Sequence, residues 1–133
     1  MKIRPIALEA EYSTLSEWWT KRRLQPPQQL ILQGAQGFAV NAGIDIMMGW
    51  FYRSGNVGFV EWITSNPSVA ASPTTADALV VLLDFMNTFA KGEGANVILC
   101  SSQDDGSVGR FISKLGWLPC GGRPHNFFVK AVT

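Results

Sequence analysis

The alternation of hydrophobic and polar residues predicts strands in the first half of the chain. Four segments have this period: residues 2–8, 37–42, 45–53 and 57–65. Pro5 marks the first segment as an edge or bulged strand, since proline donates no hydrogen bond to a neighbouring strand. A tight turn around Gly43 and the turn signal "SGN" join the other three. These segments predict an edge strand followed by consecutive hairpins.

Three other segments have helical periodicity: residues 13–23, 75–91 and 107–115. In the first, Ser13 or Thr14 can cap the helix, and Glu17 completes a capping box with Thr14. The prolines of "LQPPQQL" then end it. The second helix is predicted to end at Gly92 or Gly94. Its apolar residues at helical spacing are Ala78, Leu79, Leu82, Leu83, Met86 and Phe89.

Two further strands, residues 96–102 and 127–132, alternate with these helices, and "WLPCG" reads as one more short strand. The order is therefore β-α-ββ-β-α-β-α-β, with hairpins first and βαβ crossovers second. This order predicts an α/β (α+β) fold in which helices flank a single mixed, largely antiparallel sheet. Because the chain has no repeat and no long linker, we expect residues 1–133 to form a single domain.

The composition limits the classes of function. Of the 133 residues, 47% are hydrophobic and 16% are charged, with 11 basic against 10 acidic side chains. This balance does not indicate a nucleic-acid-binding surface, which is usually basic. The apolar run "ALVVLL" stops at Asp84, whereas a membrane span needs about 20 residues. We therefore expect a cytoplasmic protein without a signal peptide. In that compartment Cys100 and Cys120 should be reduced thiols, and because no histidine pattern lies near them we expect no metal site.

The centre of the chain, "EWITSNPSVAASPTTADALVVLLDFM", reads as a strand, a small-residue loop and a helix. This arrangement can hold an anion at a helix N-terminus. Together with the later "FISKLGW", in which Leu115-Gly116-Trp117 looks like an "lGF" signature, it resembles the GNAT (general N-acetyltransferase) superfamily over nearly the whole chain. "EWITSNPSVAASPTTADAL" also looks like small GNAT-like proteins of tailed phages, which would act in the host cytoplasm. The resemblance implies a GNAT-like acyl-CoA N-acyltransferase fold, acetyl-CoA as co-substrate and an amine as acceptor.

The resemblance also implies where the cofactor binds. In the family, a splayed strand carries the pantetheine arm, and a loop of the form Q/R-x-x-G-x-G/A wraps the pyrophosphate. The matching loop here is degenerate, because Thr74 replaces the first glycine, Ala76 fills the last position and no basic residue or glutamine is present. Asp77, expected in the first helical turn, would repel a pyrophosphate. A plain helix cap by Ser72 or Thr74 explains the same residues. The implied cofactor-binding residues are Ile63, Thr64, Ser65, Ala71, Ser72, Thr74, Thr75, Ala76 and Asp105.

Glu61 is the candidate catalytic residue. By alternation it shares a face of its strand with Val57, Phe59 and Ile63, and a carboxylate on an apolar face suits a general base that takes a proton from an amine. Glutamates on this strand have that role in parts of the family, so the resemblance implies it for Glu61. The alternative is that the strand bulges after Phe59 and leaves Glu61 solvated or paired with an arginine.

Two aromatic segments are candidates for binding. In GNAT-like folds the "EWWTKRR" region borders the acceptor site, so Trp18 or Trp19 is expected to line a substrate pocket. Met47 and Met48, together with residues 50–52, could form an apolar patch through which two copies make a homodimer.

Two hypotheses of function follow. The first is an acyl-CoA-dependent N-acyltransferase, in which an amine attacks acetyl-CoA directly and proximity and an oxyanion-stabilising amide carry much of the catalysis. The second is a GNAT-fold module that binds a protein or another ligand without acetyl transfer. The second is supported by the degenerate loop and by Ile112, which stands where the family has a proton-donating tyrosine, four residues before Gly116.

Overall fold

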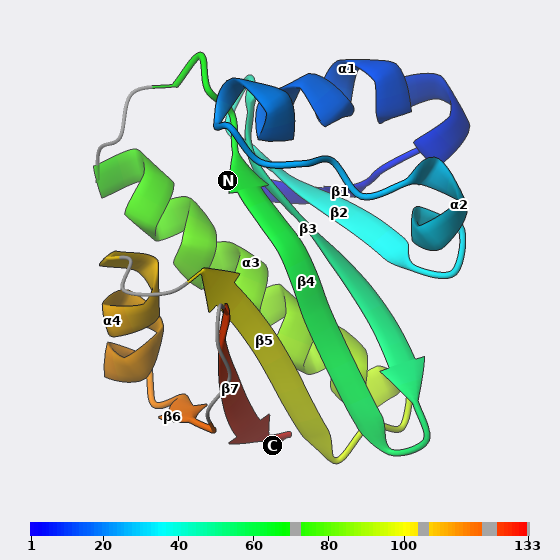
Figure 1. Ribbon diagram of the computed structural model, residues 1–133. Helices are drawn as coiled ribbons and strands as arrows, with labels where there is room; N and C mark the ends of the chain where they lie inside the picture. The colour runs from blue at the N-terminus through cyan, green and yellow to red at the C-terminus, as the bar shows by residue number, and fades with distance from the viewer. Residues whose placement is uncertain (70–72, 104–106, 121–124, 133) are drawn as a thin grey trace.

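The protein is built on one mixed sheet with helices against both faces (Figure 1). The computed structural model describes residues 1–69, 73–103, 107–120 and 125–132. The strands are β1 (Lys2–Pro5), β2 (Gln36–Asn41), β3 (Asp45–Ser54), β4 (Val57–Ser65), β5 (Val97–Gln103), β6 (Leu118–Pro119) and β7 (His125–Ala131). The helices are α1 (Leu8–Lys21), α2 (Gln29–Leu32), α3 (Pro73–Gly92) and α4 (Ser107–Lys114).

The seven strands have the order β1-β2-β3-β4-β5-β7-β6. β1 to β4 pair antiparallel in sequence order, and β5, β7 and β6 also pair antiparallel. β4 and β5 pair in parallel, and α3 makes the long connection that a parallel pair requires. The predicted mixed, largely antiparallel sheet with flanking helices is therefore confirmed.

The first helix differs most from its prediction. α1 has Ala7 as its N-cap, so Ser13 and Thr14 lie inside the helix and the predicted capping box is wrong. The start of the helix is held by Glu11, whose carboxylate accepts a hydrogen bond from the Ala7 N–H at 2.7 Å and forms an ion pair with Arg4 of β1. The ion pair between Arg4 and Glu11 joins a strand to a helix, so it cannot be predicted from a local capping pattern. α2, just after the prolines, is a short helix that the pattern also did not predict.

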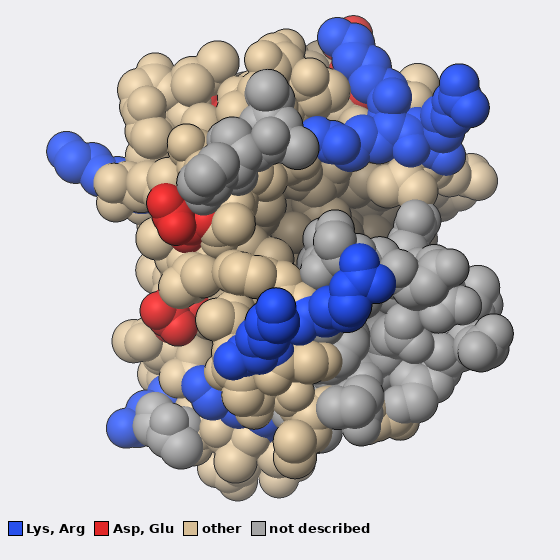
Figure 2. Space-filling view, turned by 90° about the vertical axis from the view of Figure 1, so that its left-hand side faces the viewer, with Lys and Arg blue, Asp and Glu red and all other residues tan. Residues whose placement is uncertain are grey.

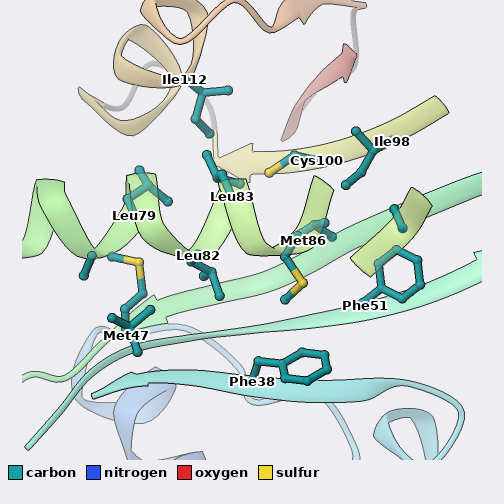
Figure 3. Packing of buried hydrophobic residues seen from close by; sticks show 14 of the residues in the cluster. Phe38, Met47, Phe51, Leu79, Leu82, Leu83, Met86, Ile98, Cys100 and Ile112 are labelled. Atoms are coloured by element: carbon teal, nitrogen blue, oxygen red, sulfur yellow. The ribbon is translucent and has the colours of Figure 1, made fainter. Parts of the chain in front are cut away.

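α3 packs its apolar stripe against one face of the sheet (Figure 3). The helix residues buried there are Ala78, Leu79, Leu82, Leu83, Met86 and Ala90. The periodicity predicted the first five, and the predicted Phe89 is only partly buried against the same cluster. They contact side chains of β2 to β5 and of α4, among them Phe38, Val40, Met47, Phe51, Val60, Ile98, Cys100 and Ile112. Gly49 of β3 permits the close approach, because a Cβ atom there would lie 3.0 Å from Leu82 Cδ2. Burying a large apolar side chain contributes about 1.5–3 kcal/mol, so this interface fixes which face of α3 meets the sheet.

The opposite face of the sheet carries α1 and α2. The buried residues between them are Leu15, Trp18, Trp19, Leu32, Ala39, Met48 and Trp50. Met47, Met48, Trp50 and Phe51 are each 5% exposed or less, so the predicted apolar patch for a second subunit is wrong for these four side chains. Alternation along β3 sends them to the two cores of the same chain instead of to its surface.

Candidate active site

β4 and β5 form a fork in the middle of the sheet. They pair in parallel over Val57–Val60 and Val97–Cys100, and no register joins their remaining residues, all of which the structure describes. β4 continues beside β3 as far as Ser65, and β5 continues beside β7 as far as Gln103. The two tips diverge, and the N-terminal end of α3 lies on the side to which the fork opens (Figure 1). One edge of β4 therefore offers peptide groups to a ligand that lies in the fork.

A β-bulge lies on β4 where the fork begins. The register with β3 shifts between Glu61 and Thr64, so that Trp62 and Ile63 together stand opposite a single residue of β3. Trp62 has a φ of +55°, which a large side chain rarely adopts. The extra residue sends Ile63 to the α3 face, while Trp62 packs on the α1 face, to which the pairing of β3 and β4 also assigns Glu61. The prediction that Glu61 and Ile63 share a face is therefore wrong.

Glu61 is half-buried next to the fork, where a tyrosine holds it. The Tyr52 hydroxyl donates a hydrogen bond to the Glu61 carboxylate. Burial, the negative charge of Glu61 and this hydrogen bond raise the pKa of Tyr52 to about 12, so Tyr52 remains a neutral donor at pH 7. Burial and then the charge of Glu61 raise the pKa of the Cys100 thiol, also to about 12. Although the strand bulges, Glu61 is thus not the solvated residue of the alternative interpretation.

The predicted cofactor residues of β4 lie along the open edge. Ile63, Thr64 and Ser65 form the end of the strand beyond its pairing with β5. Thr64 is 5% exposed, and its Oγ1 has no hydrogen-bond partner among the described residues, which costs about 1–3 kcal/mol. The Ser65 carbonyl accepts a hydrogen bond from Arg22 Nε at 3.1 Å. The edge of β4 beyond its pairing with β5 fits an amide-containing chain such as pantetheine.

The predicted loop residues are described in part. Ala71, Ser72 and Asp105 lie outside the described residues. The first turn of α3 contains the exposed Thr74 and the half-exposed Thr75 and Ala76. Because α3 already begins at Pro73, Asp77 lies beyond the first turn, and the prediction that it stands there is wrong. The first turn has no acidic side chain, so the electrostatics of the described part of this helix end fit an anion better than the sequence suggested.

Basic side chains stand on two sides of the face to which the fork opens. Lys21, Arg22 and Arg23 are exposed at the C-terminal end of α1, and Arg110 and Lys114 are exposed on α4. The C-terminal end of α1 and the helix α4 both lie toward the left of Figure 1. Figure 2, which views the molecule from that side, shows Lys and Arg side chains in two groups with a hollowed surface between them. Such a pair of groups attracts an anionic ligand.

The predicted substrate-pocket tryptophans are both buried beneath α1, with exposures of 8% for Trp18 and 3% for Trp19. Trp18 also lines an open pocket of about 390 Å³ between α1, the β2–β3 turn and the residues after β4. Glu11, Glu17, Lys21, Asp45 and Asn66 are among its other lining residues. Neither Glu61 nor Trp19 lines this pocket, so the structure does not bring it together with the fork.

Sequence reasoning missed Tyr52 and Trp62 as neighbours of the site, and it did not predict that Arg22 contacts β4. Tyr52 could have been found from the β3–β4 hairpin register, whereas the bulge and the contact of Arg22 with β4 have no local signal. Ile112 is fully buried and points toward α3 (Figure 3), so it lies in the core and provides no proton donor. Within the described residues, no helix could span a membrane, and no three His, Cys, Asp or Glu side chains are grouped to hold a metal ion.

Comparisons with known proteins define the class of fold. No protein-family model matches the sequence, and no curated protein matches it either. Among solved structures, the ribosomal-protein-S18-alanine N-acetyltransferase from Escherichia coli has a TM-score of 0.74 at 9% identity, covering 99% of this chain and 94% of that one. The aminoglycoside 6'-N-acetyltransferase from Enterococcus faecium has a TM-score of 0.75 at 12% identity, covering 100% and 98%. yncA from Salmonella typhimurium, solved with its cofactor acetyl-CoA, has a TM-score of 0.70 at 12% identity, covering 99% and 94%.

The chain therefore has the GNAT acetyltransferase fold, as the sequence resemblance predicted. At identities this low, the similarity shows the fold and leaves substrate and activity to be argued from the site. The resemblance to phage proteins, the cytoplasmic location and the homodimer remain predictions.

Proposed function

We propose that this protein is an acyl-CoA-dependent N-acyltransferase that transfers an acetyl group from acetyl-CoA to an amine by direct attack. The observation that carries the proposal is the position of Glu61, a half-buried carboxylate held by Tyr52 at the start of the fork between β4 and β5. Both things that acyl transfer to an amine needs meet there: a strand edge that can hold a thioester, and a base beside it.

Different groups of the described residues would bind different parts of acetyl-CoA. The peptide groups of Ile63, Thr64 and Ser65 would hold the pantetheine arm along the open edge of β4. The first turn of α3 would receive the pyrophosphate on its backbone N–H groups, and the two basic groups around the hollow of Figure 2 would attract the phosphates. When bound, acetyl-CoA supplies the thioester carbonyl.

In the proposed step, the acceptor nitrogen forms a C–N bond with the thioester carbonyl carbon, and the C–S bond breaks. Glu61 accepts the proton that the nitrogen loses, while the electron pair of the C–S bond leaves with sulfur as a thiolate. Because a thiol has a pKa of about 8.5, water can protonate this thiolate, so a buried isoleucine in place of the family's tyrosine does not stop the reaction. Tyr52 keeps the carboxylate oriented through its hydrogen bond.

Binding of acetyl-CoA is the first test. We expect it to raise the midpoint of thermal unfolding, since a ligand at about 100 times its dissociation constant adds about 2.7 kcal/mol of stability. Titration calorimetry should give a dissociation constant that rises with salt, because phosphate contacts are screened. No shift and no heat at millimolar acetyl-CoA would overturn the proposal.

Release of free CoA thiol with a panel of primary amines is the second test. Glu61→Gln removes the base but keeps the shape and the hydrogen-bond acceptor, so we expect acetyl-CoA to bind while turnover falls by about 10²–10⁴-fold. Glu93→Gln, at an exposed position after α3, is the matched control and should leave turnover unchanged. Equal turnover in the two variants would exclude Glu61 as the base.

A module that binds without acetyl transfer is the second candidate, and Ile112 is the observation that favours it. The position that carries a proton donor in many members of the family is fully buried here, between α4 and α3. Acetyl-CoA binding without turnover for any amine in the panel would favour this function.

A further inference from the structure

Three partly exposed aromatic rings lie on the same face of β3 and β4 as Glu61, beside the buried Trp50. The antiparallel register pairs Tyr52 with Phe59 and Trp50 with Glu61, which places Tyr52, Phe59 and Glu61 on the face away from α3. The Tyr52 and Phe59 rings stack, with centroids 4.7 Å apart and planes 7° from parallel. The Trp62 ring lies 6.0 Å from Tyr52, tilted by 32°. We call these four residues, Tyr52, Phe59, Glu61 and Trp62, the aromatic–carboxylate surface.

The aromatic–carboxylate surface is partly open to solvent. All four side chains are intermediate in exposure, whereas the neighbouring Trp50 and Phe51 are 1% and 3% exposed. In Figure 1, α1 and α2 lie over β1 to β3 and the upper end of the sheet, and no helix of the described residues lies in front of the middle of β4. These four side chains are thus partly exposed at the start of the fork, while the Tyr52 and Phe59 rings cover one face of each other.

The bulge accounts for the third ring. In a regular strand, Trp62 would point to the face opposite Glu61. The extra residue in β4 turns it onto the Glu61 face, where it packs beside Tyr52, and the cost is a positive φ that is unfavourable by about 1–3 kcal/mol. Strain of this kind persists only where the surrounding structure imposes it. Here the strained backbone places the Trp62 ring beside Tyr52 and on the same face as Glu61.

We propose that the aromatic–carboxylate surface binds an ammonium group whose apolar substituent lies against the aromatic rings. The carboxylate of Glu61 attracts the cation, and the faces of tryptophan and tyrosine rings, which carry negative charge density, add cation–π attraction. Tyr52 is neutral and does not cancel the charge of Glu61, because its hydroxyl is a hydrogen-bond donor with a raised pKa. A neutral molecule of the same shape would make the same ring contacts as the ammonium but would lack the attraction to Glu61 and the cation–π attraction.

The interpretation of this surface as the acceptor site of an acyl transfer rests on the function proposed above. It would then select amines that are cationic in solution and carry an apolar or aromatic body. The bound ammonium would first release one proton through Glu61 to solvent, and Glu61 would accept the second proton when the neutral nitrogen attacks. Ammonium binding itself does not require acetyl-CoA, so the two ideas can be tested separately.

The experiment compares 2-phenylethylammonium with 2-phenylethanol, a neutral molecule of similar shape, by titration calorimetry at pH 7 without acetyl-CoA. We expect the ammonium to bind at least about tenfold more tightly. Glu61→Gln should remove most of this preference and leave the binding of the alcohol unchanged. Equal affinities for the two molecules, or an unchanged preference in Glu61→Gln, would overturn the inference.

Ring variants separate the aromatic contribution from the charge. Trp62→Leu should weaken ammonium binding by about 2- to 30-fold, and Trp62→Phe, which keeps a smaller ring and guards against a folding defect, by less. Tyr12→Phe is the control for a changed aromatic side chain beside the same apolar cluster, because its hydroxyl donates to the Pro27 carbonyl and not to Glu61, and it should change nothing. Full ammonium affinity in folded Trp62→Leu and Trp62→Phe would exclude the ring from the site.

An acetyl-CoA titration run in parallel distinguishes a failure of this inference from a failure of the proposed acyltransferase function. Acetyl-CoA binding without ammonium preference overturns this inference and leaves the proposed function standing. Ammonium preference without acetyl-CoA binding supports the surface as a cation site and overturns the acyltransferase.

Discussion

Arg4 joins three elements that are distant in sequence, and its removal gives a sharp test of how the fold is held. Its Nε and Nη2 donate to Asp45 Oδ1 and Oδ2 at 3.0 and 2.6 Å. Its Nη1 and Nη2 donate to Glu11 Oε2 and Oε1 at 3.0 and 2.5 Å. The guanidinium thus links β1 to the start of α1 and to β3, and Arg4→Met breaks both links while keeping most of the apolar stem.

The expected cost follows from the burial of the three side chains, which are 33% exposed for Arg4, 25% for Glu11 and 22% for Asp45. Charged hydrogen bonds contribute about 1.5–3 kcal/mol, and fully exposed ion pairs about 0.2–1 kcal/mol. Because the cluster is partly screened, and because the variant leaves two carboxylates facing each other, we expect a loss of about 2–3 kcal/mol at pH 7. Urea unfolding followed by circular dichroism measures this free energy.

The loss should depend on pH with a definite sign. Hydrogen bonds from Arg4 lower the pKa values of Glu11 and Asp45 in the folded protein. A carboxyl group with a lowered folded pKa stabilises the protein above its unfolded pKa, about 4, and loses this contribution as the pH falls through the folded value. The difference between wild type and Arg4→Met should therefore be full at pH 6–7 and shrink below about pH 4.

Lys2→Met is the control for this experiment, because it removes a positive charge from the same strand at an exposed position. It should cost less than about 0.5 kcal/mol. An Arg4→Met loss no larger than that of Lys2→Met, or a loss that does not change between pH 7 and pH 3, would refute the reasoning.

Three further predictions concern buried groups. Thr64→Val should raise the free energy of unfolding by about 1 kcal/mol, because the Oγ1 atom has no partner among the described residues; a loss above 0.5 kcal/mol in urea unfolding would show that the hydroxyl is bonded. In the native protein, iodoacetamide should modify the exposed Cys120 but not Cys100, whose thiol is fully buried with a pKa raised to about 12, and mass spectrometry should find the second adduct only after denaturation. Gly37→Ala should cost about 1–3 kcal/mol, because its Cβ would lie 2.5 Å from a buried tryptophan ring; Gly34→Ala, with its nearest atom at 3.7 Å, should be near neutral in the same assay.

The apolar stripe of α3 shows how far periodicity reaches. Its spacing predicted an apolar stripe of Ala78, Leu79, Leu82, Leu83, Met86 and Phe89. The first five are buried and Phe89 is partly buried against the same core, because one face of a long amphipathic helix has to meet the sheet. The strands of the hairpins and the mixed sheet followed from alternation and turn residues in the same way. These features depend on neighbours within a few positions along the chain, and the sequence contains those neighbours.

The start of α1 shows where local patterns fail. A capping box at Thr14 was consistent with the sequence, yet the helix begins after Ala7, because Glu11 finds Arg4 on a neighbouring strand. The apolar residues of β3 were expected to include a surface patch, and the two cores of the chain bury most of them.

The sequence by itself determined the class of fold, the central strand-loop-helix and Glu61 as the carboxylate to examine. Only the tertiary structure decided the face that Glu61 occupies, its tyrosine partner and the ring beside it. The physical reason is the bulge at Trp62: one extra residue reverses the alternation of β4, and it depends on the register with β3, which no window of the sequence contains.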